Sequence, residues 1–121
     1  MRTYLYALLV ILVLLIAHDL GLAYGLYLSV WPYDIFTHML GGLGIGFCLA
    51  AILGTHGTAI VHKRRAVLIG VLVAGILWEA FEAYYNIAGY PVGTKLYWID
   101  TIKDLFDDML GGTIAAYCVF K

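Results

Sequence analysis

The chain has 121 residues, enough for a single domain but not for a second core. Hydrophobic residues make up 64% of the sequence, charged residues make up 12%, and the mean hydropathy is +0.93. So few charges could not cover the surface of a soluble domain of this size. The net charge of −1 and the two cysteines argue against a nucleic-acid-binding protein and a disulfide-stapled secreted fold. The composition therefore predicts a small protein that lies in a lipid bilayer.

Four segments are apolar over the roughly 20 residues that a helix needs to cross a hydrocarbon core about 30 Å thick. The expected spans cover residues 4–28, 34–53, 66–88 and 100–120. A secretory signal peptide is the competing interpretation of the N-terminus, but no cleavage site follows the first apolar run and the run is too long. The sequence thus predicts an all-α fold: a polytopic membrane four-helix bundle that forms one transmembrane domain over residues 1–121.

Basic residues predict the orientation, because cytoplasmic loops of membrane proteins carry an excess of lysine and arginine. With four crossings, Arg2, the run Lys63-Arg64-Arg65 and Lys121 fall on one side of the membrane. The opposite side carries a short turn and a loop with Lys95 alone. We therefore expect a protein of the cell's inner membrane with both termini in the cytoplasm.

In this topology, all eight carboxylates fall on the outer side of the membrane or in its outer half. They are Asp19, Asp34, Glu79, Glu82, Asp100, Asp104, Asp107 and Asp108. The apolar part of the fourth span, residues 109–120, is only ~18 Å long, so the last three aspartates lie at the depth of the outer leaflet. At 100° per residue, the carboxylates of each span share one helix face, and His38 shares the face of Asp34. The sequence predicts that the faces of the last three spans meet.

Two segments resemble each other at an offset of seventy residues. Residues 34–42 read Asp-Ile-Phe-Thr-His-Met-Leu-Gly-Gly, and residues 104–112 read Asp-Leu-Phe-Asp-Asp-Met-Leu-Gly-Gly. Both segments enter the membrane from the same side, which predicts that the bundle is built from two parallel-repeated helical hairpins. The glycine pairs that end the two segments are typical of places where membrane helices approach closely.

Carboxylates in close contact need a bound cation, shared protons or a solvated vestibule, because like charges and burial both disfavour ionisation. A bound cation is the most specific of the three interpretations. The predicted ligands are Asp34, His38, Glu79, Glu82, Asp104 and Asp108. This set of carboxylates and one imidazole suits Mg²⁺, Mn²⁺, Zn²⁺ or non-haem iron. The glutamate-x-x-histidine spacing of common di-iron bundles is absent.

Three motifs resemble, in chain order, those of YjdF-like inner-membrane proteins and, more distantly, those of VanZ-like proteins. They read Tyr33-Asp34-x-x-x-His38-x-x-Gly41-Gly42, Glu79-x-x-Glu82 and Asp100-Thr101-x-x-Asp104. The resemblance covers residues 33–121 and implies roles for Asp34, His38, Glu79, Glu82, Asp100 and Asp104. This chain is shorter than YjdF-like proteins, and their pattern does not require Asp107-Asp108. The resemblance implies little about activity, because YjdF-like proteins are largely uncharacterised and VanZ-like proteins are linked to glycopeptide resistance without a settled mechanism.

Three functions fit these expectations. The first is a metal-dependent hydrolase or transferase of lipid-linked or phosphate-ester substrates, in which Asp107 or Asp100 acts as general base. The second is cation or proton transport, or metal sensing, for which a pore would require a homo-oligomer. The third is a structural module in which a metal ion staples the helices. Membrane lipid is an expected partner, and nucleic acid is not.

Overall fold

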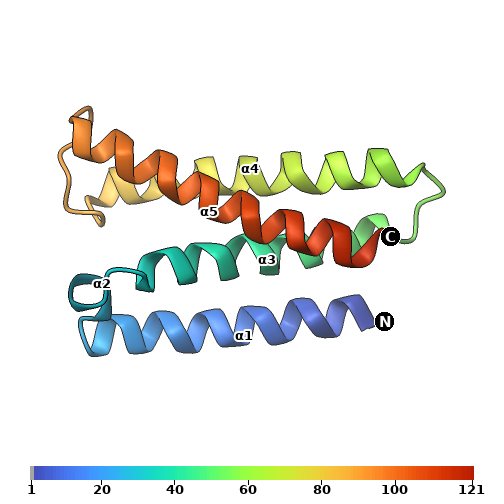
Figure 1. The fold of residues 1–121 in the computed structure, drawn as a ribbon, viewed down its shortest axis with the longest axis horizontal. Coiled ribbons are helices and arrows are strands. Elements are labelled where there is room, and N and C mark those ends of the chain that lie inside the picture. The colour runs from blue at the N-terminus through green and yellow to red at the C-terminus, as the bar shows by residue number, and fades with distance from the viewer. Residues whose placement is uncertain (1) are drawn as a thin grey trace.

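The computed structural model of the chain describes residues 2–121, and within this range all regular structure is helical. The four long helices are α1 (Arg2–Ala23), α3 (Tyr33–Leu53), α4 (Ile60–Tyr85) and α5 (Lys95–Val119), and a one-turn helix, α2 (Leu26–Ser29), follows α1. Helix α3 is central and packs against α1, α4 and α5. The N-terminus, the C-terminus and the loop between α3 and α4 lie at one end of the molecule, and α2 lies at the other (Figure 1).

Three of the helices, α1, α3 and α4, are long and apolar enough to cross a membrane, with mean hydropathies of 2.4, 1.8 and 1.9. Large apolar side chains on their outer faces are exposed, as lipid contact requires; Leu8 is 65% exposed and Ile69 is 63% exposed. Helix α5 differs because Lys103 and four aspartates lie in the part of the helix before Met109. Three of the four expected spans thus have the length and composition of a membrane helix.

The first helix is shorter than the expected span 4–28. It ends at Ala23 because Gly25 adopts a left-handed backbone conformation with φ of 64°, which breaks the helix before α2. Tyr33 closes this turn onto α1 by donating a hydrogen bond from its hydroxyl to the carbonyl oxygen of Ala17.

The last two helices begin earlier than expected. Helix α4 starts at Ile60 rather than residue 66, and it ends at Tyr85 because Asn86 caps it in a left-handed conformation with φ of 53°. Helix α5 starts at Lys95 rather than residue 100, because the Oγ1 atom of Thr94 caps it by accepting a hydrogen bond from the Tyr97 amide at 3.3 Å. Only α3 has nearly the expected bounds.

The closest packing in the fold is between α3 and α5, at the two glycine pairs. A Cβ atom on Gly42 would overlap the backbone carbonyl group of Asp108, and one on Gly111 would overlap the carbonyl oxygen of Met39. One turn further along, a Cβ atom on Gly46 would lie 2.7 Å from the Cβ atom of Ala115. The glycines therefore set the separation of α3 and α5.

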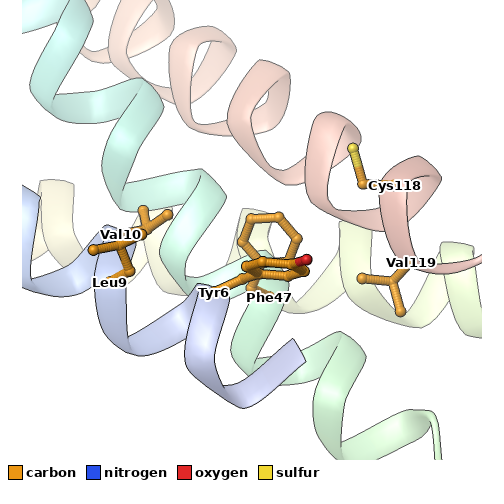
Figure 2. Close-up of a pocket in the computed structure, with 6 residues that line it drawn as sticks. All are labelled: Tyr6, Leu9, Val10, Phe47, Cys118 and Val119. Carbon is orange, nitrogen blue, oxygen red and sulfur yellow. The ribbon is translucent and has the colours of Figure 1, made fainter. Parts of the chain in front are cut away.

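An apolar core fills the half of the molecule that contains the chain ends. Ala50, Val67, Val71, Ala116 and Phe120 are its buried members. Arg64 of α4 fixes the end of α5, because its Nε atom donates to the carbonyl oxygen of Phe120 at 2.8 Å and its guanidinium stacks on Tyr117. On the other side of the core, an apolar pocket opens between α1, α3 and α5. Figure 2 shows the residues that line it: Tyr6, Leu9, Val10, Phe47, Cys118 and Val119.

The glycine contact predicts opposite outcomes for two adjacent alanine substitutions. Gly42→Ala should lower the stability of the protein by about 1–3 kcal/mol, because the backbone of Asp108 cannot yield to the new methyl group. Gly41→Ala should leave stability unchanged or raise it by up to about 1 kcal/mol, because its Cβ atom would meet Asp108 Oδ1 at an ordinary 3.7 Å and alanine favours a helix. Thermal unfolding in detergent measures both, and equal effects would contradict the assigned contact.

Candidate metal centre

Three helices bring their polar faces together in the half of the molecule opposite the chain ends. The chain direction explains this placement: α3 and α5 begin where α4 ends, so His38 near the start of α3 meets Glu79 near the end of α4. Asp104 approaches from the third helix, α5. Helix α1 contributes no side chain to the two groups of carboxylate and imidazole residues described next.

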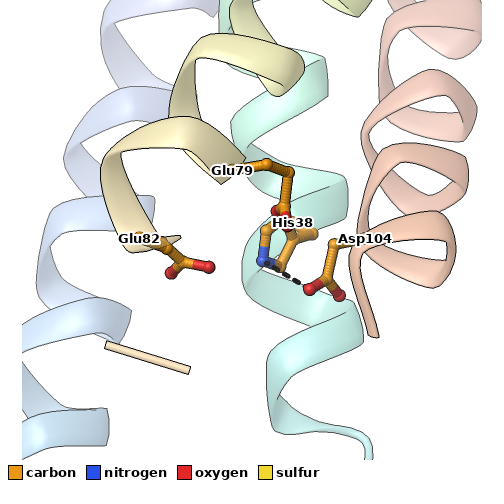
Figure 3. A group of neighbouring side chains, drawn as sticks. All are labelled: His38, Glu79, Glu82 and Asp104. Carbon is orange, nitrogen blue, oxygen red and sulfur yellow. Dashed lines mark ion pairs between the residues drawn. The ribbon is translucent and has the colours of Figure 1, made fainter. Parts of the chain in front are cut away.

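His38, Glu79, Glu82 and Asp104, hereafter the four-residue cluster, form the tightest group. Each offers one nitrogen or oxygen atom within 4.8 Å of an atom of every other member. Figure 3 shows their side chains converging from three helices, with Asp104 Oδ2 3.7 Å from His38 Nε2. Asp104 is 1% exposed, Glu79 is 6% exposed and His38 is 9% exposed, whereas Glu82 is half-buried. The cluster is thus largely shielded from solvent.

Glu79 has an unusual position in this cluster. Its Oε1 atom is buried and has no hydrogen-bond partner among residues 2–121. The side chain extends toward His38 (Figure 3). A buried carboxylate oxygen without a partner costs free energy, which a cation or a proton at that position would recover.

A second group, Asp34, Asp100 and Asp104, shares one member with the cluster; together with Lys103 it is called the lysine group below. Its three carboxylates also place oxygen atoms within 4.8 Å of one another. Lys103 Nζ lies 2.5 Å from Asp34 Oδ2, 2.6 Å from Asp104 Oδ1 and 3.9 Å from Asp100 Oδ1. An ammonium group therefore sits between these three carboxylates.

The two groups account for most of the residues predicted as ligands. Four of the six form the cluster, and the other two contact its imidazole: Asp108 Oδ1 lies 3.4 Å from His38 Nδ1, and Asp34 Oδ1 lies 3.7 Å from His38 Nε2. Both contacts are ion pairs, so the two carboxylates lie on either side of the imidazole.

The two carboxylates expected to act as general base lie in different surroundings. Asp100 belongs to the lysine group and is half-buried. Asp107 is 5% exposed and lies outside both groups; its Oδ2 atom has no hydrogen-bond partner in the described part of the chain.

The charge of the site is strongly unbalanced. Six carboxylates face one ammonium group and one imidazole, and Asp104 and Glu79 are almost fully buried. Like charges at such separations repel strongly where water is excluded. Imidazole and carboxylate donors from three helices form a set that divalent cations bind.

The whole chain, residues 1–121, matches the family described as Predicted membrane protein (DUF2238). The chain belongs to this family. A YjdF-like affiliation is compatible with DUF2238 membership, whereas the match gives no support to the more distant VanZ-like resemblance. No curated protein and no solved structure matches the chain.

Sequence reasoning missed one member of the site of this DUF2238 protein. Lys103 was not among the predicted site residues, but its ammonium group is paired with carboxylates. The sequence did contain a signal for this pairing, because Lys103 lies within residues 100–108, which include four aspartates. Two buried hydroxyl residues, Thr37 and Thr101, also flank the site, and both lie in motifs that carried the family resemblance.

Proposed function

We propose that this DUF2238 protein binds a divalent cation between His38, Glu79, Glu82 and Asp104. The observation that carries the proposal is the convergence of four donor atoms from three helices on one buried position, where Glu79 Oε1 lacks a partner among the described residues. Asp34 and Asp108, which complete the predicted ligand set, flank the imidazole and would hold its orientation.

The donor set limits the cation to a few candidates. One imidazole and three carboxylates suit Mg²⁺, Mn²⁺, Zn²⁺ or iron, and no thiolate is available because neither cysteine belongs to the cluster. Ionisable side chains at membrane depth are rare and are typically functional. The spacing of Asp104 from the start of α5, ~14 Å along the helix, is consistent with a site below the lipid headgroups.

We propose further that the cation supports hydrolysis or transfer of a phosphate-ester or lipid-linked group. A bound divalent cation would activate a water molecule and neutralise phosphoryl charge. Asp107, whose Oδ2 atom has no partner in residues 2–121, would accept the proton; Asp100 is less suited, because the nearby ammonium of Lys103 offsets its charge.

A transport function is less well supported for a single chain. The core of Ala50, Val67, Val71, Ala116 and Phe120 separates the acidic site from the end of the molecule that carries the termini. A cation crossing this apolar layer would lose its ligands and its hydration together. The site is therefore better suited to chemistry entered from one side.

Mn²⁺ binding tests the cation site. The purified full-length protein should bind one Mn²⁺ per chain, measured by the loss of the free-ion signal in electron paramagnetic resonance. Glu79→Gln should weaken binding at least about 100-fold, because it removes a buried charged ligand. The matched control is Asp19→Asn, which removes an exposed carboxylate of α1 outside the cluster. Equal binding by the two variants would overturn the proposal.

Turnover of a lipid phosphate tests the catalytic role. Mn²⁺-loaded protein should release phosphate from phosphatidic acid in mixed micelles, and Asp107→Asn should slow release about 100-fold or more while one Mn²⁺ still binds. Loss of the ion together with the activity would make Asp107 a ligand. An inactive protein that binds Mn²⁺ and melts at a lower temperature after chelation would favour the structural staple instead.

We also propose that α5 forms a fourth span and that both termini lie on the cytoplasmic side of the inner membrane. The support is the common end of the two termini in Figure 1 and the basic residues Arg2, Lys63, Arg64, Arg65 and Lys121 near that end.

Reporter fusions test this orientation. A fluorescent protein fused after Lys121 should fluoresce, and alkaline phosphatase inserted at Gly89, between α4 and α5, should be active outside the cytoplasm. The two reporters are then exchanged as a control, and both should become inactive. Phosphatase activity at both positions would show that α5 does not cross the membrane.

A further inference from the structure

We infer that Lys103 is a tethered cation that occupies a second cation site, formed by Asp34, Asp100 and Asp104, and so limits the protein to one bound divalent ion. The inference rests on the proposed cation site in the four-residue cluster and extends it to the neighbouring lysine group. It assigns to Lys103 the control of both the affinity and the number of bound ions.

The geometry of the lysine group is that of an occupied cation site. The three carboxylates come from two helices and place oxygen atoms within 4.8 Å of one another, as the members of the four-residue cluster do. The Nζ atom of Lys103 stands among them, at 2.5 Å from Asp34 and 2.6 Å from Asp104. An ammonium group is a compact point charge, so it can take the place of a small cation among oxygen atoms.

Asp104 connects the two sites. It is 1% exposed, its Oδ1 atom faces Lys103 at 2.6 Å, and its Oδ2 atom faces His38 at 3.7 Å. A divalent ion bound by the four-residue cluster would therefore share this buried carboxylate with the ammonium group. Two positive charges on opposite oxygens of one carboxylate repel each other strongly where water is excluded.

The two sites also differ in what they lack. Glu79 Oε1 and Asp104 Oδ1 are both buried without a hydrogen-bond partner in the described chain, but Asp104 Oδ1 has the ammonium of Lys103 at 2.6 Å, whereas no ion pair reaches Glu79 among residues 2–121. The cluster is thus the site left for a soluble cation, and Lys103 fills the other one.

Removal of the ammonium group tests the inference. Lys103→Met keeps an unbranched side chain of similar length but removes the positive charge. This variant should bind a first Mn²⁺ at least tenfold more tightly than the wild type, because a neighbouring positive charge is gone. It should also bind a second Mn²⁺ between Asp34, Asp100 and Asp104, which electron paramagnetic resonance detects as a second equivalent lost from the free-ion signal.

Two further variants separate charge from packing. Lys103→Arg keeps the positive charge and should bind one Mn²⁺ with an affinity within threefold of the wild type. The double variant Asp34→Asn/Lys103→Met removes one positive and one negative charge, so it keeps the net charge of the site and gives a reading even if Lys103→Met alone does not fold. It should bind one Mn²⁺, still more tightly than the wild type, because Asp104 is no longer shared with an ammonium group.

The outcomes distinguish this inference from the proposed function. A wild-type protein that binds no Mn²⁺ would overturn both. A wild-type protein that binds one ion, with Lys103→Met and the double variant unchanged in affinity and number of ions, would leave the proposed cation site standing and overturn the role of Lys103. A second ion in Lys103→Arg would also overturn it, since the charge would then not be the cause.

Discussion

The contact between the backbones of α3 and α5 at Gly42 and Gly111 controls the rest of the structure. Because neither glycine has a Cβ atom, the two helices approach until the backbone of Asp108 lies against Gly42. At that helix separation, two aspartates of α5 lie beside the imidazole of His38. Asp108 Oδ1 is 3.4 Å from Nδ1, and Asp104 Oδ2 is 3.7 Å from Nε2. A third glycine, Gly75 of α4, leaves room for the carboxylate of Asp108, since a Cβ atom there would lie 2.8 Å from its Oδ2 atom. The same small residues that pack the helices therefore also concentrate the negative charge.

This concentration has an energetic cost that the chain offsets only in part. Lys103 compensates the carboxylates of the lysine group, and His38 lies among Asp34, Asp104 and Asp108. Within residues 2–121, no cationic side chain does the same for Glu79, although the carboxylate is almost fully buried. A site selected only for stability would hold an apolar residue there, because replacing poorly paired buried charges by apolar groups is often stabilising. An incompletely compensated carboxylate at the centre of a convergent group is instead typical of a protein that completes its site with a ligand.

The parts of the fold that could be predicted from the sequence are those set by local patterns. Apolar length gave the helices, and the period of 100° per residue correctly placed Glu79 with Glu82, and Asp34 with His38, on faces that meet. The glycine pairs at the ends of the two similar segments indicated where α3 and α5 approach.

The parts that could not be predicted depend on backbone conformations and on long side chains. The left-handed conformation of Gly25 divides the first expected span, and the cap at Thr94 starts α5 before its charged region. Lys103 can reach several carboxylates from one position on the helix, so spacing alone does not select its partners. The relation of the two similar segments as a structural repeat stays a prediction.

One end of the molecule is rich in carboxylates, the other end is rich in basic residues, and the part between them is apolar. Carboxylates lie where α3 and α5 begin and α4 ends, and arginine and lysine lie at the other end, where Arg64 binds the terminal turn of α5. Between them, Val67, Val71 and Ala116 are almost completely buried and form an apolar layer. This asymmetry follows from the sequence of α5, in which six charged residues precede Met109 and small and apolar residues follow it up to Phe120. In the proposed four-span arrangement, the charged half of α5 has to be covered by protein, and α3 provides cover where it packs against α5 at the glycine contact.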